Sequence, residues 1–72
     1  MMKQLEMIEF VDVESRSPGF AIVRVGEDEI GLTLSLEEDG DIEVFLRPAE
    51  CERLLAALRQ AVGEAKGAAL AA

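Results

Sequence analysis

The sequence contains no histidine, tryptophan or tyrosine, and it has one cysteine, Cys51. Histidine is the commonest general base and metal ligand, so its absence excludes most enzyme classes and most transition-metal sites. One cysteine cannot form an internal disulfide, and a lone thiol is typical of a reducing compartment. We therefore expect a cytoplasmic, non-catalytic protein with no cofactor and no bound metal.

Long apolar runs are also absent. No stretch approaches the roughly 18 residues of a membrane span, and the first ten residues mix charged and apolar side chains, unlike a secretion signal. We expect no membrane segment. The chain has 72 residues, of which 50% are hydrophobic. A domain of this length buries only about 60% of the surface of its unfolded chain, so the apolar residues exceed what one small core needs and predict an interface.

Hydrophobic periodicity predicts an α+β fold, with a four-stranded antiparallel meander sheet followed by one helix. Strands are predicted at about residues 5–14, 20–25, 29–37 and 41–47, separated by glycine-rich, proline-containing or acidic turns. From Pro48 the spacing changes to three and four, which predicts an amphipathic helix over about residues 48–65, packed on one face of the sheet. Its apolar stripe consists of Cys51, Leu54, Leu55, Leu58, Val62 and Ala65.

These elements predict a single β-β-β-β-α domain over residues 1–66. Gly63 and Gly67 weaken the end of the helix, and the alanine-rich residues that follow have no packing pattern. We therefore expect a flexible, frayed tail over residues 67–72.

Side-chain alternation predicts the register, because residues directly opposite in an antiparallel pair share a face. Pairing Leu36 with Ile42 leaves a three-residue loop that ends at Gly40, and pairing Val25 with Ile30 leaves a four-residue loop. The first strand is apolar on both sides. If Leu5, Met7, Val11 and Val13 face the helix, Ile8 and Phe10 lie on the opposite side, but the apolar residues on both sides leave this facing open.

The face opposite the helix then has a patch of apolar and basic side chains that is unusual for a solvated surface. Its predicted members are Phe10, Phe20, Ile22, Arg24, Thr33, Phe45 and Arg47. We expect this patch to form a homodimer by stacking two sheets face to face. A different protein or a peptide is the alternative occupant.

The net charge of −8 argues against binding to duplex DNA or to an anionic membrane. The acidic turn around Gly40 lacks the ligand spacing of an EF-hand, so we interpret it as a solvated hairpin tip. Cys51 lies on the apolar stripe with no histidine to activate it, which favours a role as a small core residue. No pair of carboxylates is singled out for hydrolysis.

The join between the last strand and the helix reads Val44, Phe45, Leu46, Arg47, Pro48, Ala49, Glu50, Cys51, Glu52, Arg53, Leu54. With four preceding strands, it resembles the positive-cofactor-four and Whirly-like single-stranded-DNA-binding proteins. The resemblance implies a homodimer that binds single-stranded nucleic acid on its strand face, through the positions of Phe20, Arg24, Phe45 and Arg47. That family is rich in lysine and arginine where this chain is acidic.

Together these features predict a non-catalytic homodimeric interaction or regulatory module that acts through protein contacts on the helix-free face of the sheet. Two alternatives follow from the same residues. The first is a transcriptional regulator that binds single-stranded nucleic acid, and its acidic charge disfavours it. The second is an acidic imitation of nucleic acid, an antagonist or antitoxin-like protein that blocks a basic partner.

Overall fold

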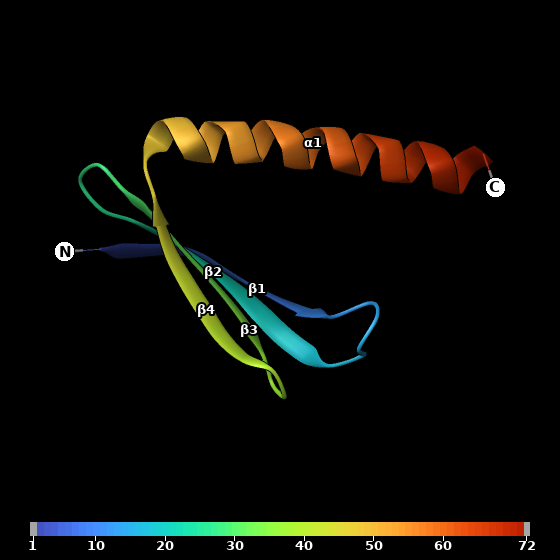
Figure 1. Ribbon diagram of the computed structural model, residues 1–72, viewed down its shortest axis with the longest axis horizontal. Helices are drawn as coiled ribbons and strands as arrows, with labels where there is room; N and C mark the ends of the chain where they lie inside the picture. The colour runs from blue at the N-terminus through green and yellow to red at the C-terminus, as the bar shows by residue number, and fades with distance from the viewer. Residues whose placement is uncertain (1, 72) are drawn as a thin grey trace.

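The computed structural model describes residues 2–71, and Figure 1 shows its four-stranded antiparallel sheet followed by one long helix. The strands are β1 (Lys3–Val11), β2 (Pro18–Val25), β3 (Ile30–Leu36) and β4 (Gly40–Leu46), and the helix is α1 (Pro48–Ala71). The strands pair in the order β1-β2-β3-β4, so each strand lies beside its neighbours in sequence. The predicted α+β class and meander order are confirmed.

The β1–β2 loop begins three residues earlier than predicted because Asp12 organises a turn. The backbone N–H of Asp12 donates to the Ser17 carbonyl at 2.9 Å, and its side-chain Oδ2 accepts from the Ser15 N–H at 2.8 Å. The hydrogen bonds from the Ser15 backbone and side chain lower the pKa of the Asp12 carboxyl. Arg16 takes a left-handed conformation with φ of 66°, which is uncommon for a residue with a side chain.

The predicted β2–β3 register is confirmed, with Val25 opposite Ile30. The predicted β3–β4 register is wrong by two residues, since Leu36 lies opposite Gly40 and Ile42 lies opposite Leu34. The Asp39 N–H donates to the Leu36 carbonyl at 3.3 Å, which closes the turn early. Gly40, with φ of 84°, then begins β4 directly. A shift by two keeps every side chain on its predicted face.

The facing of β1 that would place Phe10 in the predicted patch is not the observed one. Ile8 lies opposite Ala21 and Met7 lies opposite Ile22, with a bulge between Gln4 and Glu6. Because β1 is apolar on both sides, alternation does not determine its facing, and the β1–β2 loop and this bulge set it instead. Phe10 consequently lies on the opposite face of the sheet from Phe20.

The sheet therefore has two distinct faces. The first, called here the apolar face, consists of Ile8, Phe10, Ala21, Val23, Val25, Ile30, Leu32, Leu34, Leu36, Ile42, Val44 and Leu46, with Lys3 and Glu6 at the β1 edge. The second, called the mixed face, consists of Gln4, Met7, Glu9, Val11, Phe20, Ile22, Arg24, Gly31, Thr33, Ser35, Asp41, Glu43 and Phe45.

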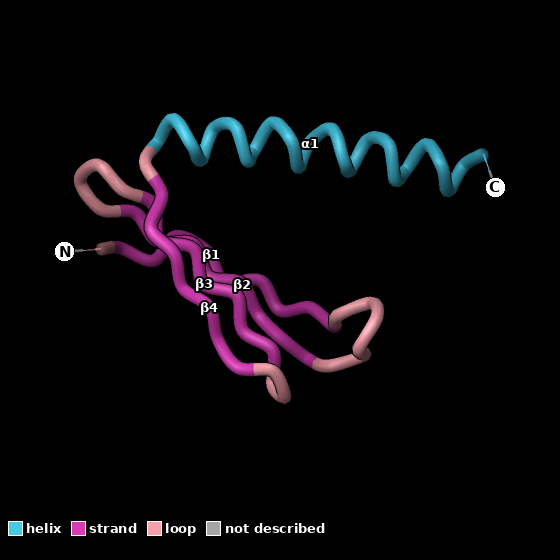
Figure 2. The backbone as a smooth tube through the Cα atoms, viewed as in Figure 1, coloured by secondary structure: helices cyan, strands magenta, loops and turns pink. Residues whose placement is uncertain are grey.

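The predicted packing of the helix on the sheet is wrong. Side chains from 48 to 70 are exposed except that of Cys51, which is half-buried, and α1 makes no extensive contact with any strand. Figure 2 shows α1 starting at the end of β4 and diverging from the sheet along its length.

The local join accounts for this direction. Arg47 is the single residue between β4 and α1, and Pro48 restricts it to extended backbone. The Arg47 N–H donates to Oε1 of Glu50 at 3.1 Å, and its carbonyl accepts the first helical hydrogen bond, from the Cys51 N–H at 3.0 Å. The join is therefore short and hydrogen-bonded, and α1 leaves β4 at an angle to the sheet.

The helix is also longer than predicted. It continues past residue 65, and residues 67–71 of the predicted flexible tail are helical. Ala72, the last residue of that tail, lies outside the described residues. Across residues 2–71, no helix is both long enough and apolar enough to cross a membrane.

Candidate protein interface

The predicted patch lies mostly on the mixed face, where β2, β3 and β4 place Phe20, Ile22, Arg24, Thr33 and Phe45 together. Among the described residues, Ile22 is the only buried hydrophobic side chain, at 9% exposure, whereas Phe45 is 54% exposed. Two predicted members lie elsewhere. Phe10 is on the apolar face, and Arg47 is in the join after β4.

Polar side chains on the mixed face bond to one another across three strands. The Arg24 guanidinium donates to the Thr33 hydroxyl at 3.1 Å and to Oε2 of Glu43 at 3.0 Å, and the Thr33 hydroxyl donates to the same Glu43 oxygen at 3.1 Å. Nearby, the Ser35 hydroxyl donates to the Asp41 carboxylate. These groups satisfy each other, so they stabilise strand pairing and leave Arg24 with its charge paired.

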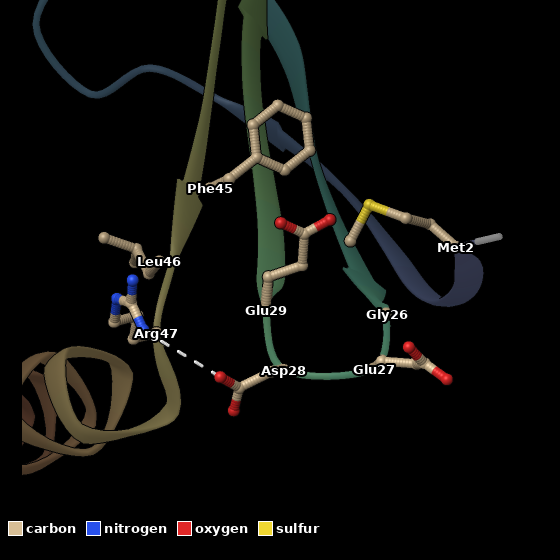
Figure 3. Close-up of a pocket in the computed structure, with 8 residues that line it drawn as sticks. All are labelled: Met2, Gly26, Glu27, Asp28, Glu29, Phe45, Leu46 and Arg47. Atoms are coloured by element: carbon tan, nitrogen blue, oxygen red, sulfur yellow. Dashed lines mark ion pairs between the residues drawn. The ribbon is translucent and has the colours of Figure 1, made fainter.

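Two residues of the predicted patch, Phe45 and Arg47, border an open hollow of about 570 Å³ beside the β2–β3 loop (Figure 3). The hollow is lined by Met2, Gly26, Glu27, Asp28, Glu29, Phe45, Leu46 and Arg47. Nη1 of Arg47 lies 3.9 Å from Oδ2 of Asp28, and both side chains are 78% exposed. Such a pair contributes little to stability. Glu27 and Glu29 add two further carboxylates to the lining of the hollow, and this negative charge disfavours phosphate.

The acidic hairpin tips show no ligand geometry. Within residues 2–71, no group of three or more cysteine or acidic side chains is positioned to hold a metal ion. Cys51 is half-buried at the start of α1 and is a free thiol. The acidic hairpin tips therefore offer only solvated carboxylates.

The apolar face is the feature that the sequence reasoning missed, because the helix was expected to cover it. None of its side chains is buried, and several large ones are exposed, including Ile42 at 61%, Ile8, Leu34 and Val44. The buried residues of the strands, Ile22, Gly31 and Ser35, all lie on the mixed face. The larger apolar surface of the sheet is thus the less protected one.

The apolar stripe of α1 is uncovered as well. Leu54, Leu55, Leu58 and Val62 are all exposed along one side of the helix. An isolated helix in water gains little stability from its backbone alone, and most helical stability in proteins comes from packing of the apolar side.

The total accessible surface measures how much is left uncovered. It is 6004 Å² for this 7.8 kDa chain. A folded monomer of that mass is expected to expose about 4,400 Å². The excess of about 1,600 Å² per chain is roughly twice the 800 Å² that each partner contributes to a standard protein interface.

No protein-family model, curated protein or solved structure matches this chain.

Proposed function

We propose that this chain is a non-catalytic interaction module that works as a homodimer and acts through protein contacts. The observation that supports this most is the uncovered apolar surface, since Ile22 is the only buried hydrophobic residue of the described chain. Most other apolar side chains of the strands are only half-buried or exposed, so one chain removes little apolar area from water to offset the conformational entropy lost on folding. Association with a second copy supplies the missing burial.

A role in binding single-stranded nucleic acid has weaker support. Of the two arginines that the resemblance would use, Arg24 is bonded to Glu43 at 3.0 Å, and Arg47 lies 3.9 Å from Asp28. Phosphate binding would have to displace these carboxylates against a net charge of −8. The pairing of both arginines therefore disfavours phosphate binding.

Sedimentation equilibrium tests the proposal. We expect about twice the 7.8 kDa mass of one chain. Ile42→Glu and Phe45→Glu form a matched pair, because both residues lie on β4 with 61% and 54% exposure, but on opposite faces. We expect Ile42→Glu to give monomer or unfolded chain, since it puts a charge on the larger uncovered face, and Phe45→Glu to remain a dimer.

The reverse result, with Phe45→Glu monomeric and Ile42→Glu dimeric, would place the dimer interface on the mixed face, where the sequence predicted it. A wild-type chain that is folded and monomeric at every concentration tested would overturn the proposed function.

A further inference from the structure

The two uncovered apolar surfaces of this chain are complementary in size. The stripe from Cys51 to Ala65 extends about 21 Å at 1.5 Å per helical residue. β3, from Ile30 to Leu36, extends about 20 Å at 3.4 Å per residue. The four strands span about 14 Å from first to last, and a helix with its side chains is about 10 Å wide. One helix would therefore cover most of the apolar face.

The chain's own helix does not take this position. Arg47 is the single residue between β4 and α1, its N–H donates to the Glu50 side chain, and the helix makes no extensive contact with any strand. Figure 1 shows the resulting open arrangement, with the helix lying beside the sheet at one end and apart from it at the other. In this arrangement the two complementary surfaces of one chain do not meet, and a second copy offers each of them its counterpart.

We propose that two copies exchange helices, so that α1 of each copy lies on the apolar face of the other copy's sheet. This inference rests on the proposed function, because it specifies how the homodimer forms. The contact is isologous, since the same stripe and the same face are used by both copies, and it closes after two chains. It yields four layers, with a sheet on each outside and the two helices between them.

The excess accessible surface of each chain agrees with a dimer of this kind. An excess of about 1,600 Å² on each chain gives about 3,200 Å² of buried surface in the pair, within the 2,000–5,000 Å² of obligate homodimers. The exchange leaves the mixed face and its Arg24–Glu43 pair at the surface of the dimer, together with the acidic hairpin tips. That outer surface, with Phe45 exposed on it, stays available to another protein.

Cysteine cross-linking between two differently tagged chains tests the exchange. Both chains have Cys51→Ala to remove the native thiol. One also has Leu34→Cys, in the middle of the apolar face, and the other has Leu58→Cys, in the middle of the stripe. After mixing, unfolding, refolding and oxidation, we expect a disulfide between the two chains, which doubles the mass of the band on a non-reducing gel.

Matched controls use the same gel. A chain with Phe45→Cys replaces the Leu34→Cys partner, since Phe45 is similarly exposed but lies on the mixed face, and we expect no cross-link to Leu58→Cys. A single chain with both Leu34→Cys and Leu58→Cys should also form a band of doubled mass. Sedimentation of each reduced variant confirms that it is a dimer before oxidation.

Three outcomes would overturn helix exchange. An internal disulfide in the double variant, running at the mass of one chain, would mean that the helix covers its own sheet. Cross-links only between two Leu34→Cys chains would mean that sheets stack on sheets, and cross-links only between two Leu58→Cys chains would mean that helices pack on helices. Wild-type dimers without any Leu34→Cys to Leu58→Cys bond would exclude the contact while the homodimer itself stands. A monomer in sedimentation would instead refute the proposed function.

Discussion

Gly19 and Gly31 are both in the central strands, but they differ in what a side chain would meet. A Cβ at Gly19 would lie 2.5 Å from the Ser35 backbone oxygen and 2.7 Å from Cδ2 of Leu36. A Cβ at Gly31 would lie 3.3 Å from Cε of Met2 and from Cε1 of Phe45. The first contact is with backbone of the neighbouring strand, which cannot move without breaking the pairing, whereas the Met2 side chain is flexible.

We therefore predict that Gly19→Ala lowers the free energy of unfolding by about 1–3 kcal/mol, the usual cost of overpacking. Gly31→Ala should change it by less than about 0.5 kcal/mol, although Gly31 is the more buried of the two. Urea unfolding at one fixed chain concentration measures both. Equal losses for the two variants would contradict this explanation.

Residue patterns predicted the faces of β2, β3 and β4 but not that of β1. Ile30, Leu32, Leu34 and Leu36 alternate with small or polar residues, so their face follows from period two even where the β3–β4 register was wrong. In β1, Met7 and Ile8 are adjacent and both apolar, so alternation does not indicate which of the two points toward the apolar face. The facing of Phe10 was therefore decided by hydrogen bonding in the loop around Asp12, which alternation does not describe.

At the scale of the element, the first turn of α1 sets the shape of the chain. Glu50 accepts a hydrogen bond from the Arg47 N–H, whereas Glu52, two residues later, has no such bond to the join. Both carboxylates lie near the N-terminal end of the helix dipole, so they differ mainly in this bond.

We predict that Glu50→Ala lowers the free energy of unfolding by about 0.5–1.5 kcal/mol more than Glu52→Ala, which is the typical worth of one hydrogen bond. Chemical denaturation followed by far-ultraviolet circular dichroism compares the two. If Glu52→Ala costs as much, the dipole accounts for the effect and the bond to Arg47 does not.

The existence and start of α1 were predictable, because Pro48 and the change of period are local signals. The position of α1 relative to the sheet was not predictable. An amphipathic stripe shows that a helix must be covered on one side, but the stripe from Cys51 to Ala65 is the same whether the covering sheet belongs to its own chain or to another. The predicted end of the helix is too early because Gly63 and Gly67 do not end it: in a helix interior each glycine costs only about 1 kcal/mol.

At the scale of the whole molecule, apolar burial and charge act against each other. Association covers the excess surface of about 1,600 Å² per chain, but it also brings together two chains of net charge −8. The radius of gyration of one chain is 14.2 Å, so charges on associated copies lie within the Debye length of about 30 Å at 0.01 M salt. Repulsion between copies is therefore strong at low salt and screened at high salt.

We predict that the dissociation constant of the homodimer falls about tenfold, or about 1.4 kcal/mol, between about 0.01 M and 0.15 M sodium chloride. Sedimentation at several chain concentrations measures this dissociation constant.

A variant with Glu37→Gln, Glu38→Gln and Asp39→Asn removes three carboxylates from the β3–β4 turn and changes the net charge from −8 to −5. It should associate more tightly at low salt and depend less on salt. If the dissociation constant rises with salt instead, ion pairs and not apolar surfaces hold the two copies together. Screening by salt weakens attraction between opposite charges just as it weakens repulsion between like charges.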